Sequence, residues 1–286
     1  MAEMFFGGLE RVLLWYYTTS GTYLGVATGQ QTSLSNGATS QAYVITKPRA
    51  AGFNFDAGAQ LQQQGGDRLG SLLSFATSSL ASFDLTVDAL DPNLVALIEQ
   101  STQNTTSTVF TKTAVNSDRA APSSMGVCVA QRGVQSDGTP VYKHTFIPKA
   151  QVVIKMPGGT FRGEALVTIT ITPQKGTKMH TGQSYGSTGL NFGLANDTTD
   201  HYIWTSSYPL HITTFKSDGA ATTFITAYRP VSSTITLNGT DNEMVKNTTA
   251  TALSSISTTT GVATLSAAGT AGDLHVLTYS TNYVPV

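Results

Sequence analysis

Apolar and polar residues alternate along residues 83–89, which read FDLTVDA. The apolar residues fall on one side of this stretch: Phe83, Leu85, Val87 and Ala89. The polar residues fall on the other side: Asp84, Thr86 and Asp88. A period of two residues predicts a β-strand with one buried and one solvated face. The aspartates on the solvated face either keep it hydrated or act together as a pair of carboxylates.

The pattern becomes helical directly after this strand. Asp91 suits the N-cap position, and Pro92 suits the first turn of a helix. The apolar residues that follow recur with the spacing of one helix face: Leu94, Leu97 and Ile98. We therefore expect one helix over residues 91–100, with its apolar stripe packed on the sheet of the same chain.

Most other periodic segments predict β-strands separated by polar turns. The clearest is residues 163–172 (GEALVTITIT), where valine and isoleucine alternate with threonine. Residues 126–132 and 141–147 predict a hairpin, because Asp137-Gly138 between them is a strong turn signal. Further strands are expected at 11–17, 22–27, 41–47, 67–78, 151–156, 202–205 and 211–228, and the last two are expected to close the sheet. We expect the strand at 67–78 to pair with residues 83–90, and residues 173–200 to form a long loop.

A break at Arg229-Pro230 divides the chain. Beyond it, short strands are predicted at 233–238, 251–256, 262–266 and 274–280. The pattern thus predicts a mainly β protein with a large domain at 1–230 and a small β-rich module at 231–286.

Composition narrows the class of protein. Hydrophobic residues make up 40% of the 286 positions, so the chain can bury a stable core without disulfides or metals. Charged residues make up 12%, about half the usual share, and the net charge is −1. Tight nucleic-acid recognition is disfavoured, because it needs a basic stripe. Few charged residues on a threonine-rich sheet also favour pairing of its edge with a neighbouring chain.

Compartment and membrane signals are weak. Cys128 is the single cysteine and is expected to be a small buried residue. The N-terminal segment lacks the pattern of a signal peptide, and its longest apolar run, residues 12–17, is too short to span a membrane. We expect a product of a reducing cytoplasm, without membrane insertion.

No pattern in the chain selects a catalytic or cofactor site. Residues 182–186 match G-x-S-x-G, but their flanks lack the buried strand and the helix that a nucleophile elbow requires. The five histidines lack metal-ligand spacing, and the most strand-like of them, His144 and His211, are expected to be structural. We predict no enzyme activity, no cofactor and no metal.

Two segments carry a resemblance to a known family. SFDLTVDALDPNLVALIEQ (82–100) and KAQVVIKMPGGTFRGEALVTITITPQ (149–174) resemble, in order and spacing, the major tail tube protein of long-tailed, siphovirus-like bacteriophages. The resemblance covers roughly residues 1–230. It implies an antiparallel β-sandwich or partly closed barrel with one flanking α-helix, and a loop near residues 48–66 that reaches a neighbouring ring.

The same resemblance implies a structural function in the virion. Subunits made in the host bacterial cytoplasm would form hexameric rings that stack into a tail tube, contact other tail proteins at the tube ends and pass double-stranded DNA during ejection. Lumen-facing candidates are Asp84, Thr86 and Asp88, and candidates for a helix at the subunit boundary are Leu94, Leu97 and Ile98. Residues 231–286 resemble the immunoglobulin-like decorations of some tail proteins, which could contact host-surface glycans.

Two other functions remain open at this point. Another virion structural protein, such as a capsid decoration or a head–tail joining protein, would share the low charge and the β-rich pattern. A glycan-binding adhesin or receptor-binding protein would show clustered exposed aromatic residues.

Overall fold

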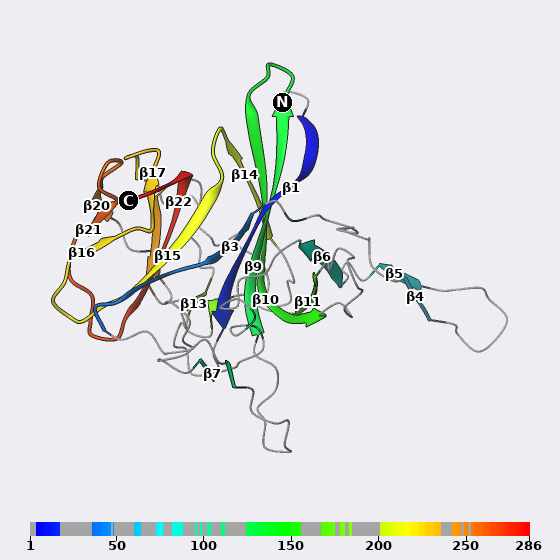
Figure 1. Ribbon diagram of the computed structural model, residues 1–286, viewed down its shortest axis with the longest axis horizontal. Coiled ribbons are helices and arrows are strands. Elements are labelled where there is room, and N and C mark those ends of the chain that lie inside the picture. Colours follow the sequence, from blue (N-terminus) through cyan, green and yellow to red (C-terminus); the bar gives the residue numbers. More distant parts are fainter. Residues whose placement is uncertain are drawn as a thin grey trace.

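The chain is mainly β, and each pair of strands that the structure describes is antiparallel. The computed structural model describes residues 4–17, 36–46, 48, 60–63, 73–76, 82–87, 95, 98, 102–103, 110–111, 124–155, 167–174, 178–180, 183–184, 201–235, 242–246, 249–250 and 253–286. Three groups of strands build the body of the molecule (Figure 1). The mainly antiparallel β architecture expected from the sequence is therefore confirmed.

The first group is a seven-stranded sheet in the order β3-β1-β9-β10-β11-β6, with β14 also paired to β10. Its strands are β1 (Met4–Tyr17), β3 (Tyr43–Thr46), β6 (Phe83–Val87), β9 (Ser124–Gln135), β10 (Pro140–Lys155), β11 (Val167–Gln174) and β14 (His201–Ser206). The predicted hairpin joins β9 to β10. Its turn has Gly138 at φ +87°, and the Asp137 carboxylate accepts a hydrogen bond from the Thr139 backbone N–H at 2.9 Å.

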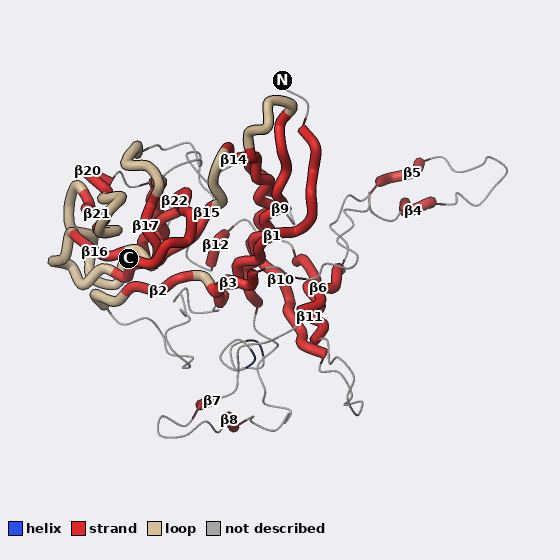
Figure 2. Tube along the Cα trace, turned by 45° about the horizontal axis from the view of Figure 1, so that its top comes forward, coloured by secondary structure: helices blue, strands red, loops and turns tan. Residues whose placement is uncertain are grey.

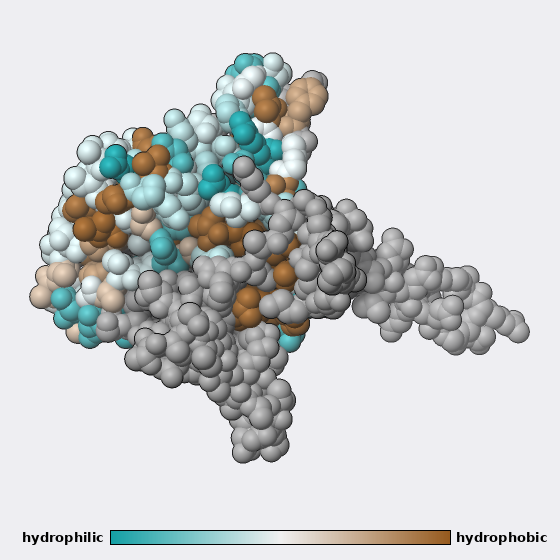
Figure 3. Space-filling view, in the orientation of Figure 1, coloured by the Kyte–Doolittle hydropathy of each residue, from teal (hydrophilic) through white to brown (hydrophobic). Residues whose placement is uncertain are grey.

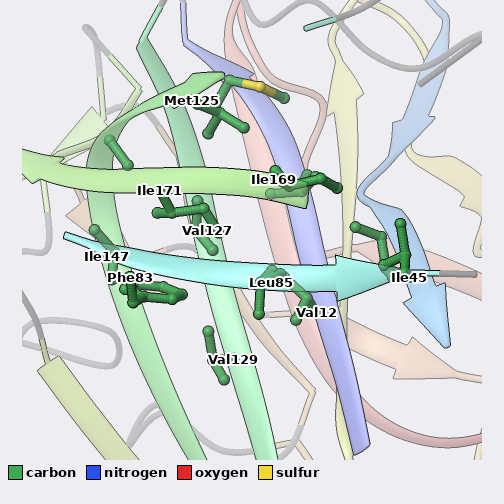
Figure 4. Packing of buried hydrophobic residues seen from close by; sticks show 14 of the residues in the cluster. Val12, Ile45, Phe83, Leu85, Met125, Val127, Val129, Ile147, Ile169 and Ile171 are labelled. Carbon is green, nitrogen blue, oxygen red and sulfur yellow. The ribbon is translucent and has the colours of Figure 1, made fainter. Parts of the chain in front are cut away.

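This sheet curls into a half-barrel around a large apolar cluster. Register shifts near Leu9 of β1 and between Ile147 and Ala150 of β10 interrupt the ladders, and such bulges bend and twist strands. In Figure 4, β6 and β11 lie in front of β1 and β9, and the labelled side chains fill the space between them. The cluster contains Val12, Leu14, Ile45, Phe83, Leu85, Val87, Met125, Val127, Val129, Ile147, Ala150, Val152, Val167, Ile169 and Ile171.

A six-stranded sheet packs against the other face of β1, β9 and β10. It has the order β19-β18-β22-β15-β2, with β17 paired to β22. Its strands are β2 (Thr39–Gln41), β15 (Leu210–Lys216), β17 (Tyr228–Pro230), β18 (Glu243–Lys246), β19 (Thr249–Ala250) and β22 (Leu274–Pro285). The second cluster joins both sheets and contains Leu13, Trp15, Ala42, Cys128, Phe146, Leu210, Ile212 and Val276. Cys128 is fully buried there, as predicted.

A three-stranded sheet covers the far face of the six-stranded one. Its strands are β16 (Thr223–Ile225), β20 (Leu253–Ile256) and β21 (Val262–Leu265). The third cluster fills this second interlayer space and contains Phe215, Phe224, Leu253, Ile256, Ala263, Leu265, Leu277 and Tyr279. Strand β15 is consequently buried on both faces, since Leu210 and Ile212 point to one cluster and Phe215 to the other.

Three two-stranded hairpins pair only within themselves among the described strands. Their strands are β4 (Gln60–Gln63) with β5 (Leu73–Ala76), β7 (Thr102–Gln103) with β8 (Phe110–Thr111), and β12 (Lys178–His180) with β13 (Gln183–Ser184). Figures 1 and 2 both show the β4–β5 hairpin standing away from the layered body.

Three predicted details are wrong, because local periodicity does not specify which strands pair. The segment 67–78 contains β5, which pairs with β4, while β6 pairs with β11. Residues 151–156 continue β10 beyond its bulge and do not form a separate strand. Segment 211–228 does not close the first sheet, since β15 belongs to the six-stranded sheet.

The predicted helix at 91–100 lies outside the described residues except at Val95 and Ile98, and the flanking helix is therefore not shown. The division at residue 230 remains a prediction. However, β22 pairs with β15 along Leu210–Lys216, on the other side of that division. The C-terminal strands therefore share one sheet with residues that precede it.

Candidate functional site: a hydroxyl-rich outer face

The outer face of the half-barrel carries a regular array of polar side chains on β6, β11 and β10. Strand register aligns them in rows, Asp84 beside Thr170 and Thr86 beside Thr168. On the next strand, Val153 lies beside Thr170 and Lys155 beside Thr168. We call this surface the hydroxyl face and define it by Ser82, Asp84, Thr86, Gln151, Val153, Lys155, Thr168, Thr170 and Thr172.

The array arises from strict alternation along each strand. Residues of β6 and β11 alternate between buried and partly exposed, because their valine, leucine, isoleucine and phenylalanine side chains enter the half-barrel. β-Branched threonine fits the outer side of a pleated strand and leaves one hydroxyl on the surface. The sequence pattern of residues 83–87 and 167–172 thus determines both the core and the hydroxyl face.

Cross-strand hydrogen bonds hold the face together. The Thr170 hydroxyl donates to Asp84 Oδ1 at 2.6 Å. Ser82 Oγ and Thr172 Oγ1 lie 3.0 Å apart, and Ser82 Oγ also donates to the Ile171 carbonyl at 3.3 Å. Cross-strand polar pairs of this kind stabilise a sheet by about 0.2–1 kcal/mol each.

The hydroxyl face is close to neutral. Asp84 and Lys155 stand at different corners of the array, where their formal charges cancel, and Lys149 continues the β10 row beyond Gln151, beside Gln174. The rest of the face consists of hydroxyl, amide and one exposed apolar side chain, Val153, which is 43% exposed. A surface of this composition hydrates well but offers little for the specific binding of an ion.

The structure distributes the predicted site residues between two places. Asp84 and Thr86 are partly exposed and lie together on the hydroxyl face. Ile98 is partly buried and packs on the half-barrel cluster, so at this position the stripe packs on its own sheet. Asp88, Leu94 and Leu97 lie outside the described residues.

The serine of the G-x-S-x-G match has a different backbone context from a nucleophile elbow. Ser184 belongs to β13 and pairs with Lys178 of β12 in a short antiparallel hairpin. A nucleophile elbow places its serine on a tight turn between a strand and a helix. Ser184 itself lies in a strand and not on such a turn.

Both histidines expected to be structural are fully buried. His144 Nε2 accepts a hydrogen bond from the Leu210 backbone N–H at 3.0 Å, which joins the two large sheets. Burial lowers the pKa of His144 and that of His211 to about 3, with the Arg11 charge contributing at His211. Burial raises the pKa of the Cys128 thiol. These groups are uncharged at neutral pH, as buried groups in an apolar interior should be.

Sequence reasoning missed a ring cluster around His211. Tyr228, Tyr279 and Tyr283 surround its imidazole at centroid distances of 4.9, 5.7 and 5.5 Å, each approaching nearly edge-on. Arg11 stacks on one of these tyrosines, with its Cζ 3.8 Å from the Tyr283 ring centroid. The sequence shows Tyr279 and Tyr283 as aromatic residues near the C-terminus, but no local sequence pattern links them to residues 11 or 211.

The described residues hold neither a metal-binding cluster nor a membrane-spanning helix. No three His, Cys, Asp or Glu side chains gather there in a way that could hold a metal ion. In the same part of the chain, no helix has both the length and the apolar character needed to cross a bilayer.

Comparison with protein-family models, with curated proteins and with solved structures finds no match to this chain.

Proposed function

We propose that this chain is the structural subunit of a bacteriophage tail tube, in which hexameric rings stack into a conduit for double-stranded DNA. The observation that carries the proposal is the hydroxyl face, where Asp84 and Thr86 lie in a hydrogen-bonded, nearly neutral array. In this proposal the face lines the bore of the tube.

The chemistry of the face suits passage of a polyanion. Each lysine that pairs with a phosphate releases a counterion, which makes contact with DNA tighter and slower to break. On the hydroxyl face Lys155 is offset by Asp84, Lys149 borders the face beside Gln174, and the threonine hydroxyls can exchange hydrogen bonds with water. A DNA duplex would therefore slide past a hydrated wall without strong ion pairs.

Sheet edges provide a route to ring formation. Among the described strands, β6 pairs with β11 and stands at one end of the first sheet. An unpaired edge with few charges readily accepts a strand from another chain. A heterologous contact of this kind closes into a ring when its rotation divides the circle evenly, and axial contacts that do not close give a filament.

An apolar pair at a free end adds a second contact surface. Phe5 of β1 and Val134 of β9 face each other across the ladder and are 64% and 40% exposed. Figure 1 shows the β9–β10 hairpin and the start of β1 projecting together from the body. Figure 3 shows further apolar areas on the same face of the body. We assign Phe5 and Val134 to a contact between subunits.

The β4–β5 hairpin supports stacking between rings. Two-stranded hairpins without a packing partner are marginally stable in water. Among the described strands, β4 and β5 pair only with each other and project from the body, so this hairpin gains a partner when a second subunit covers it. In the proposal this hairpin lies against the next ring, and the C-terminal strands face outward, where host-surface glycans and other tail proteins are possible contacts.

Electron microscopy of the purified full-length chain tests the proposal. We expect hexameric rings or hollow tubes in negative stain, and light scattering should show assembly that increases with concentration. Closed trimers or pentamers would refute a tail tube and would instead favour a capsid decoration or a receptor-binding protein.

A further inference from the structure

The end of β22 reaches across to the first sheet through the side chain of Tyr283. The Arg11 Cζ lies over the Tyr283 ring, 3.8 Å from its centroid. The Tyr283 hydroxyl donates a hydrogen bond to the Leu210 carbonyl at 3.0 Å. Arg11 belongs to β1, whereas Leu210 belongs to β15. Tyr283 therefore ties the half-barrel to the six-stranded sheet at its edge.

The backbone at Tyr283 is held in an unfavourable conformation. Its φ is +61°, in the left-handed region that bulky side chains rarely adopt. The Thr281 hydroxyl accepts a hydrogen bond from the Tyr283 N–H at 3.0 Å and donates to the Arg229 carbonyl at 2.9 Å. Contacts with the ring and the hydroxyl must offset this strain, so loss of those contacts favours a relaxed chain end.

His211 is the titratable group at the base of this arrangement. It is fully buried, and neither of its ring nitrogens has a hydrogen-bond partner among the described residues. The groups that face it are Arg11 from β1, Tyr228 from β17, and Tyr279 and Tyr283 from β22. Arg11 is itself 3.7 Å from the Glu10 carboxylate.

The neighbouring ionisable groups cannot neutralise a charge on His211. Burial is the main cause that raises the pKa of Tyr279 to about 12, and burial also raises the pKa of Tyr283. Both phenols therefore stay protonated. His144 of β10 is engaged with the Leu210 N–H. A proton on His211 would therefore lie beside the Arg11 cation, while the Glu10 carboxylate pairs with Arg11 and not with His211.

We propose that residues 282–286 form a strap that fastens the two large sheets together and that protonation of His211 releases it. An imidazolium at this position repels Arg11 and competes with it for the Tyr283 ring. Once the strap moves away, His211 and Arg11 gain access to water. The strained Tyr283 backbone then relaxes.

Proton linkage sets the sensitivity of the release. In the fastened state the pKa of His211 is about 3, whereas an imidazole in water titrates near about 6.5. The released state binds one more proton than the fastened state. The equilibrium constant for release therefore increases by up to about tenfold for each unit by which the pH falls between those two values.

A spin label on the strap of the full-length protein tests the proposal. Val284 is 42% exposed, and the single native thiol, Cys128, is buried, so Val284→Cys can be labelled selectively. We expect the label to be immobile at pH 7 and to become mobile as the pH is lowered toward 4, while circular dichroism in the same samples still reports native strands. Mobility that increases only when the dichroism signal is lost would overturn the proposal.

Two histidine variants separate His211 from general acid effects. His211→Phe keeps an aromatic ring among the three tyrosines and removes the titration, so the label should stay immobile at pH 4. His144→Gln keeps a hydrogen-bond acceptor for Leu210, and its release profile should match that of the parent. An unchanged release profile in His211→Phe would contradict the mechanism.

Should His211→Phe fail to fold, Tyr283→Phe provides the test. This variant keeps the ring under Arg11 and loses the hydroxyl bond to Leu210. We expect release at a higher pH than in the parent protein. A release midpoint that does not move would show that Tyr283 does not fasten the strap.

Discussion

The indole of Trp15 lies directly against the backbone of Gly126 on the neighbouring strand, and a β-carbon built on Gly126 would overlap the ring. Trp15 is 1% exposed and belongs to the cluster that joins the two large sheets. Glycine at position 126 thus permits the largest side chain of that cluster to lie flat between the layers.

Gly126→Ala should therefore weaken the packing of the two sheets. Displacement of Trp15 from a close-packed interior should lower the free energy of unfolding by about 1–3 kcal/mol. Urea denaturation followed by tryptophan fluorescence measures the change. Gly8→Ala is the matched control, because a β-carbon there meets nothing within 4 Å. Equal losses in the two variants would contradict the role of Gly126.

As the pH is lowered, the fold should begin to lose stability at a pH well above the one at which carboxylates titrate. The buried His144 and His211 have pKa values of about 3 in the folded state and near about 6.5 when unfolded. The unfolded chain binds more protons between those values, so stability is complete above about pH 6.5 and falls as the pH decreases. His144 contributes up to about 1.4 kcal/mol per pH unit in this window, and His211 contributes the same as long as the strap stays fastened.

Urea titrations at pH 7, 6, 5 and 4 test this dependence. The carboxyl groups of Asp137 and Asp218 have lowered pKa values, because backbone N–H groups of Thr139 and of Ala221 donate to them. Their stabilisation is present above pH 3.8 and is lost only as the pH falls through the lowered values. A flat stability profile between pH 6 and pH 4 would mean that the two histidines are not buried as neutral groups.

The sequence predicts local features of this fold much better than its long-range pairings. Alternation over residues 83–87 and the Asp137-Gly138 turn are both found, because each depends on neighbouring residues. The wrong pairing of 67–78 with 83–90 came from proximity along the chain, whereas β6 pairs with β11, more than 80 positions further along. Strand β15 (LHITTFK) was expected in the first sheet, since buried threonine and histidine conceal that both its faces are covered.

The candidate site follows the same division. Asp84 and Thr86 were identified as one polar face from the period of two residues alone. The other side of the array, on β10, and the hydrogen bond from Thr170 to Asp84 depend on register between distant strands, which periodicity does not fix. The ring cluster at His211 depends on three strands and could not be predicted for the same reason.

A positive charge on the hydroxyl face should convert a passive wall into a DNA-binding one. If the face lines a bore, Thr86→Lys places a cation from every subunit around the duplex. Assembled Thr86→Lys particles should then bind short double-stranded DNA at low salt and release it as salt is raised. Thr258→Lys, on an exposed turn between β20 and β21, is the control for the same substitution elsewhere. Equal DNA binding by both variants would argue against a bore lined by this face.

Loss of the exposed apolar pair should affect assembly more than folding. Phe5 is 64% exposed, so Phe5→Ser removes little buried area within one chain and should change the free energy of unfolding by less than about 1 kcal/mol. Light scattering should nevertheless show that a higher protein concentration is needed for assembly. Ile225→Ser, at a side chain 56% exposed on the three-stranded sheet, serves as the control and should assemble like the parent. If the two variants assembled equally well, Phe5 would not belong to a subunit contact.

The orientation of the hydroxyl face within an assembled particle is the most direct test of the proposed function. Cryo-electron microscopy of particles formed by the full-length chain would determine both their symmetry and the residues around any central opening. We expect stacked six-fold rings in which Asp84, Thr86 and Thr170 border the bore. Closed particles of another symmetry, or six-fold rings with these three residues on the outer wall, would contradict a DNA conduit lined by the hydroxyl face.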